Sequence, residues 1–144
     1  MKYYADSSFL VSCYLADANT ARAKAWLQQS NSPLPFTDLH ELEVFNALRL
    51  GVFRRVILQA EADAAIADIQ SDLLSGLLFR VPVDWPCAFR TAARLSEQHS
   101  AINGSRSLDI LHVAAAKELR SGEILSFDTR QKSLAVAAGL RVLP

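Results

Sequence analysis

The chain has 144 residues, of which 51% are hydrophobic and 21% are charged, so the composition is that of a globular protein and excludes a disordered one. This length suits one domain that buries a proper core. Fifteen basic and fifteen acidic residues cancel, which excludes a general electrostatic attraction to nucleic acid and leaves only a local patch for such binding.

Strand-like and helix-like segments alternate along the whole chain. In order, the pattern predicts a strand over 2–5, helices over 7–15 and 19–29, a strand over 34–37, helices over 38–50 and 58–74, a strand over 77–83, helices over 87–99 and 107–120, a strand over 124–127, a helix over 129–138 and a strand over 140–143. This alternation favours an α/β fold, with a parallel sheet flanked by helices in a single domain over 1–144.

Two of the expected helices begin with capping signals. Asp38, with Glu41 three residues later, fits a capping box at the start of a clear helical pattern. Ser107 is placed to cap a later helix through its hydroxyl. Both signals predict where the chain turns from loop to helix.

The two cysteines and the apolar runs bear on where the protein works. Cys13 and Cys87 form neither a CxxC pair nor a zinc pattern. Because the N-terminus carries no signal peptide, we expect a cytoplasmic protein with reduced thiols. No apolar run approaches the ~20 residues that a membrane helix needs, so we expect no membrane partner.

Four acidic residues lie where a strand gives way to a helix, or in the first turns of a helix: Asp6, Glu43, Asp109 and Asp128. Because ligands of parallel α/β sheets collect beyond the carboxyl ends of the strands, we expect these side chains to meet there. Clustered carboxylates stay ionised together only if a cation neutralises them. Mg²⁺ and Mn²⁺ prefer such oxygen ligands, so the pattern predicts a metal-dependent site that acts on phosphate.

Each acid also has a purely structural explanation. Asp6 and Asp128 would serve as helix N-caps, and Asp128 has Gln131 three residues later, as in a capping box. Asp109 suits the helix dipole in its first turn. Glu43 lies beside an apolar stripe, where a carboxylate without a partner is costly, although a place at the rim of the core would explain it.

Polar side chains accompany the acids at short spacing: Ser8, Asn46, His112 and Ser126. Such groups orient carboxylates or hold metal-bound waters in known metal sites. For His112 a core histidine with satisfied hydrogen bonds is preferred to direct ligation of a metal.

Four segments carry a family resemblance: residues 4–11 (YADSSFLV), 43–48 (EVFNAL), 107–114 (SLDILHVA) and 126–130 (SFDTR). They resemble the PIN-domain ribonucleases, and among these the VapC-type toxins of bacterial toxin–antitoxin modules, over essentially the whole chain. The four acids of the family fall in order on Asp6, Glu43, Asp109 and Asp128. The family's hydroxyl near the fourth acid falls on Ser126, where threonine is commoner.

The resemblance implies a fold, an activity and partners. The fold would be a Rossmann-like three-layer α/β/α sandwich around a mainly parallel sheet. The activity would be Mg²⁺- or Mn²⁺-dependent hydrolysis of RNA phosphodiester bonds by a homodimer that a cognate antitoxin inhibits. In that mechanism Asp6, Glu43 and Asp109 would hold the metal, and Asp128 would complete the cluster or hold a second ion.

An RNA substrate needs positive charge near an acidic site. The candidates for phosphate contacts follow the helix of Glu43 or flank the last two acids: Arg54, Arg55, Arg106 and Arg130. For each arginine taken separately, a place on a normal solvated surface is the preferred explanation.

The acids alone also permit other functions. A phosphatase or a DNA nuclease would use the same carboxylates, and a non-catalytic nucleic-acid-binding domain would keep the fold without the metal. A nucleotide-binding domain is disfavoured because the chain has no GxGxxG or Walker pattern.

Overall fold

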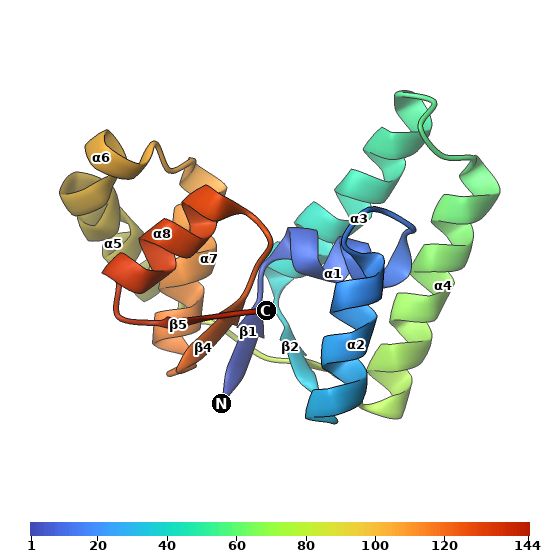
Figure 1. Cartoon of the computed structure of the whole chain (residues 1–144), viewed down its shortest axis with the longest axis horizontal. Helices are drawn as coiled ribbons and strands as arrows, with labels where there is room; N and C mark the ends of the chain where they lie inside the picture. The colour runs from blue at the N-terminus through green and yellow to red at the C-terminus, as the bar shows by residue number, and fades with distance from the viewer. The chain divides into compact units, whose positions relative to one another are not determined.

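The computed structural model describes residues 1–144, which divide into two compact units (Figure 1). The first, here called the sheet unit, joins Met1–Asp6 to Pro82–Pro144. The second, here called the helical unit, is Ser7–Val81. That the whole chain acts as a single domain stays a prediction.

The sheet unit is built on three parallel strands, β1 (Tyr3–Ala5), β4 (Glu123–Leu125) and β5 (Arg141–Leu143), in the order β1-β4-β5. The backbone pairing continues one residue beyond each of the first two strands. Asp6 N–H donates to Leu125 O at 2.9 Å, and Ser126 N–H donates to Leu143 O at 2.9 Å. Asp6 and Ser126 therefore leave the sheet at the same edge.

Helices pack around these strands within the sheet unit. They are α5 (Trp85–Leu95), a π-helical stretch (Ser96–Ser100), the short α6 (Ala101–Asn103), α7 (Ser107–Glu118) and α8 (Thr129–Ala137). The middle of α7 is buried on every side, from Ile110 to Ala116, because α5 and α8 both pack against this helix. The position of α7 is therefore set by the core, and its first turn, which carries Asp109, is held in place with it.

The helical unit contains one parallel strand pair and four helices. The elements are α1 (Ser7–Tyr14), α2 (Thr20–Ser30), β2 (Leu34–Phe36), α3 (Asp38–Phe53), α4 (Gln59–Ser75) and β3 (Leu78–Arg80), with β2 paired to β3. The short α1 packs against α2, α3 and α4. Its buried Phe9 meets the Trp26 ring edge to face, with 5.9 Å between the ring centroids.

The predicted alternation of strands and helices is confirmed, and every paired strand is parallel. No helix has both the length and the apolar character needed to cross a membrane. Cys13 and Cys87 are free thiols, each of them half-buried.

The predicted capping signals are wrong in both places. The N-cap of α3 is Thr37, whose Oγ1 accepts from His40 N–H at 3.3 Å while Thr37 N–H donates to His40 Nδ1 at 3.0 Å. Histidine stands here where a capping box ordinarily has Glu or Gln, so the usual pattern missed it. Ser107 is the first residue of α7, and Arg106 is its N-cap, without a capping hydrogen bond from its side chain.

Candidate functional site

Three of the four predicted acids lie in the sheet unit, where strands end and helices begin. Asp6 directly follows β1 and is buried, with 4% of its surface exposed. Burying a carboxylate is costly unless polar or charged groups partner it. A buried acid at the carboxyl edge of a parallel sheet is therefore a strong candidate for a functional group.

Asp128 divides its two carboxylate oxygens between two tasks. Oδ1 caps α8 by accepting from Arg130 N–H at 2.8 Å and from Gln131 N–H at 3.0 Å, which confirms the capping explanation. The buried Ser126 supports this turn, because its hydroxyl oxygen accepts from Asp128 N–H at 3.1 Å. Oδ2 is left to face the neighbouring helix, so capping and a site role do not exclude each other.

Arg106 lies between the other carboxylate oxygens. Its Nε donates to Asp109 Oδ2 at 3.0 Å, and its Nη2 lies 3.8 Å from Asp128 Oδ2. One guanidinium thus partly neutralises two carboxylates that begin different helices. The sequence predicted a divalent metal ion among the four acids. In this structure the positive charge beside Asp109 and Asp128 is the side chain of Arg106.

His112 lies one turn after Asp109 and is buried against β1. Its Nδ1 is 2.8 Å from the hydroxyl of Tyr4, and the two rings are 5.8 Å apart between centroids. The preferred explanation, a core histidine with a hydrogen-bond partner, agrees with this contact. Tyr4 was not singled out from the sequence, although its spacing of two residues from Asp6 places both on one face of the strand.

Glu43 belongs to the helical unit and lies half-buried on α3. Its Oε1 accepts a hydrogen bond from the hydroxyl of Ser7 at 3.2 Å. Ser8 and Asn46, the companions expected from the sequence, are exposed. Ser7 was missed, and the signal that could have identified it is its position directly after Asp6.

All four predicted RNA-binding arginines are exposed. Arg54 and Arg55 form the turn after α3, where Arg55 has a positive φ of 57°. Arg130 contacts Asp128 through its backbone N–H, as part of the helix cap. Arg106 differs from these three because its guanidinium is engaged with the acids.

The donor chemistry of the sheet unit fits a hard divalent cation. Asp6, Asp109 and Asp128 offer carboxylate oxygens, which Mg²⁺ and Mn²⁺ prefer. As the side chains stand, no group of three or more His, Cys, Asp or Glu residues is close enough together to hold an ion. Instead, the carboxylates of Asp109 and Asp128 both lie beside the guanidinium of Arg106.

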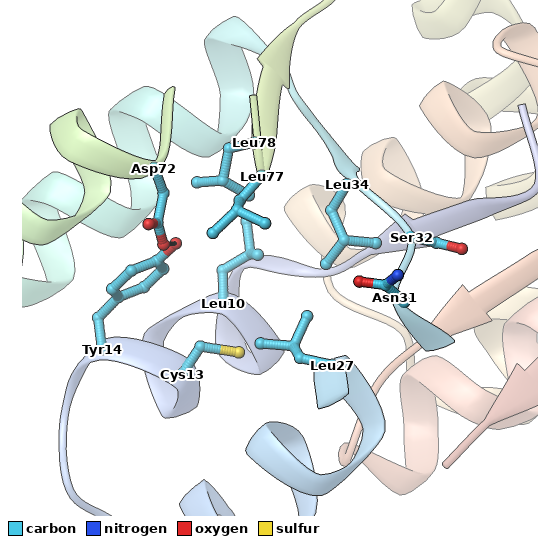
Figure 2. Close-up of a pocket in the computed structure, with 10 residues that line it drawn as sticks. All are labelled: Leu10, Cys13, Tyr14, Leu27, Asn31, Ser32, Leu34, Asp72, Leu77 and Leu78. Carbon is cyan, nitrogen blue, oxygen red and sulfur yellow. Dashed lines mark hydrogen bonds between the residues drawn. The ribbon is translucent and has the colours of Figure 1, made fainter. Parts of the chain in front are cut away.

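The helical unit also contains an apolar pocket, lined by five leucines together with polar groups (Figure 2). The Tyr14 hydroxyl points at Asp72 and donates to its Oδ2 at 2.7 Å. Burial raises the pKa of the Cys13 thiol to about 12, so this thiol is protonated at neutral pH. None of the four predicted acids lines the pocket, and it offers no activated nucleophile.

Comparisons with known proteins bear on the fold and the family. A family model described as the PIN domain matches residues 3–137. A search of curated proteins finds no match.

Several solved structures are similar over nearly the whole chain. VapC20 of Mycobacterium tuberculosis, described as a sarcin-ricin loop cleaving toxin, has a TM-score of 0.70 at 20% identity, covering 99% of this chain and 100% of that one. FitAcB of Neisseria gonorrhoeae has a TM-score of 0.66 at 14% identity, covering 99% and 96%. VapBC2 of Rickettsia felis, solved with a DNA fragment from its promoter, has a TM-score of 0.65 at 12% identity, covering 99% and 98%.

At such identities these likenesses bear on the fold alone. Together with the family match they confirm the predicted fold class, an α/β PIN domain with a parallel sheet. The match over residues 3–137 takes in all four acids and both helix starts that carry Asp109 and Asp128. The chain belongs to the PIN-domain family.

Proposed function

We propose that this protein is a Mg²⁺- or Mn²⁺-dependent endoribonuclease and the VapC-type toxin of a toxin–antitoxin pair. The observation that carries the proposal is the convergence of Asp109 and Asp128 on one guanidinium, at helix starts of the unit in which Asp6 directly follows strand β1. Carboxylates that gather around positive charge are the ligands that a metal-dependent phosphodiesterase needs. Membership of the PIN-domain family supports a nuclease over a phosphatase.

The residues that hold the metal in this proposal are Asp6, Glu43, Asp109 and Asp128. A bound divalent cation would stabilise charge on the scissile phosphate and lower the pKa of a water molecule. Glu43 is included because its segment, residues 43–48, carries the family resemblance at the second acid and lies within the residues that the family model matches.

The remaining polar groups position these acids. Ser126 holds the backbone of Asp128, and the helix cap engages one carboxylate oxygen and leaves the other available. The contact between Tyr4 and His112 ties α7, which carries Asp109, to the strand that Asp6 directly follows. Such supporting contacts fix ligand geometry before the substrate arrives.

The exposed arginines and the similar solved structures support the proposed substrate and partners. RNA phosphates would be contacted by the exposed arginines of the two units: Arg54, Arg55, Arg106 and Arg130. The likeness to VapC20, a toxin by its description, and to VapBC2 supports a toxin with an antitoxin partner. A homodimer and a cytoplasmic location complete the proposal.

The test is cleavage by purified protein, with total cellular RNA, duplex DNA and a generic phosphate monoester as substrates. Discrete RNA fragments are expected with Mn²⁺ or Mg²⁺, and they should vanish with EDTA and in Asp6→Ala and Asp109→Asn. The matched control is Asp63→Asn, which makes the same chemical change at an exposed position of α4 and should cleave normally. Cleavage of DNA or of the monoester in place of RNA would contradict the proposal.

A further inference from the structure

Arg106 bridges two helices through two different nitrogen atoms. Its backbone is extended, with φ −87° and ψ 154°, as the residue before α7. From there Nε reaches Asp109 at hydrogen-bonding distance, 3.0 Å, while Nη2 reaches Asp128 at 3.8 Å, an ion pair without a hydrogen bond. A guanidinium suits this task because its donors spread over a rigid fork.

The same bridge is open to water. The side chain of Arg106 is 70% exposed, against 24% for Asp109 and 37% for Asp128. Exposed ion pairs of this kind change an equilibrium constant by less than about fivefold each. The bridge therefore neutralises the acids without holding them strongly, and a stronger competitor for the same oxygens will displace it.

A divalent cation is such a competitor. At Asp128 it would need Oδ2, the oxygen that Arg106 contacts, because Oδ1 already accepts two hydrogen bonds in the cap of α8. At Asp109 it would compete for the carboxylate whose Oδ2 accepts from Arg106. Two positive groups at these oxygens repel each other, and the divalent ion carries twice the charge.

We propose that Arg106 is an internal counter-ion that holds Asp109 and Asp128 close together in the metal-free protein, and that a divalent cation displaces it from both acids. The inference rests on the proposed function, since it requires metal binding at these carboxylates. Arg106 is then a positioning residue in the free protein, and its release by metal would free the whole guanidinium for RNA phosphates.

The first test measures Mn²⁺ affinity by electron paramagnetic resonance on protein without RNA. If binding must displace Arg106, Arg106→Gln removes the competitor and should bind Mn²⁺ about two- to tenfold more tightly than the wild type. Arg130→Gln is the matched control, because it removes one arginine charge two residues after Asp128, where Arg130 contacts that carboxylate through its backbone N–H, while the bridge of Arg106 remains. Equal or weaker Mn²⁺ binding by Arg106→Gln than by Arg130→Gln would overturn the inference.

The second test follows the guanidinium of the wild-type protein by NMR during a Mg²⁺ titration. The Arg106 Nε–H signal, assigned by its loss in Arg106→Gln or Arg106→Lys, should shift and exchange faster with water as Mg²⁺ saturates the protein. An unchanged signal in Mg²⁺-saturated protein would show that Arg106 stays on the acids, which overturns the inference alone. Wild-type protein that binds neither ion would overturn the inference and the proposed function together.

Discussion

The two carboxylate oxygens of Asp128 should contribute separately, one to the stability of the protein and the other to its activity. Two substitutions of Asp128 can distinguish these contributions. Asp128→Ala removes both the cap of α8 and the charge near Arg106. Asp128→Asn keeps an oxygen that can accept from Arg130 N–H and Gln131 N–H, but it removes the charge. The first variant should therefore be the less stable, and both should cleave RNA much more slowly than the wild type.

The magnitudes follow from the contacts. Loss of an N-cap that accepts two backbone hydrogen bonds costs about 1 kcal/mol, within a range of about 0.5–2 kcal/mol. Loss of the exposed ion pair at 3.8 Å adds less than about 0.5 kcal/mol. We expect Asp128→Ala to lose about 1–2 kcal/mol of unfolding free energy and Asp128→Asn about 0.5 kcal/mol or less.

Urea unfolding followed by circular dichroism measures these free energies, and RNA cleavage under the same buffer conditions measures activity. Both variants should cleave RNA about 10²–10³-fold more slowly, the loss typical for one removed electrostatic stabiliser of a transition state. Equal stability of the two variants would refute the capping role of Oδ1. Normal cleavage by Asp128→Asn would refute a role for the negative charge.

Three further substitutions or treatments test other contacts. Ser126→Ala leaves the backbone N–H of Asp128 without its acceptor and should cost about 1–3 kcal/mol in urea unfolding, whereas Ser126→Thr keeps the hydroxyl and should be close to wild type. Cys13, with its pKa raised to about 12 by burial, should react with iodoacetamide at pH 8 about three orders of magnitude more slowly in folded than in unfolded protein; equal rates would contradict that pKa. Burial, and then the hydrogen bond to Asp72, raises the pKa of Tyr14, so the folded state favours the neutral phenol. The contribution of this phenol to the unfolding free energy is complete below the unfolded pKa of about 10 and is lost as the pH rises further. Tyr14→Phe should therefore flatten the fall in stability that urea unfolding measures between about pH 9 and 11.

The order of elements was predictable because each depends on local periodicity. The apolar stretch 110–116 and the turn signals around it predict a buried helix, and α7 is such a helix. The π-helical stretch Ser96–Ser100 and the short α6 were not predicted; the sequence suggested an α-helix up to residue 99 and then a loop. Backbone pattern alone does not distinguish i→i+5 from i→i+4 hydrogen bonding.

The contacts that define the candidate site were less predictable, because they join residues far apart in the chain. The spacing of Asp128 and Gln131 was enough to predict the cap. The engagement of Arg106 with Asp128 depends on how α7 and α8 pack, which no local spacing encodes. The choice of Ser7 over Ser8 as the partner of Glu43 depends on which face of α1 meets α3.

The most direct test of the central claim is a crystal structure of the protein with Mn²⁺, examined for anomalous scattering. The account predicts an anomalous peak bound by carboxylate oxygens of Asp6, Asp109 and Asp128 at about 2.0–2.4 Å. Arg106 should be turned away from both of its present partners. A Mn²⁺ ion bound elsewhere, with Asp109 and Asp128 still beside Arg106, would contradict the account.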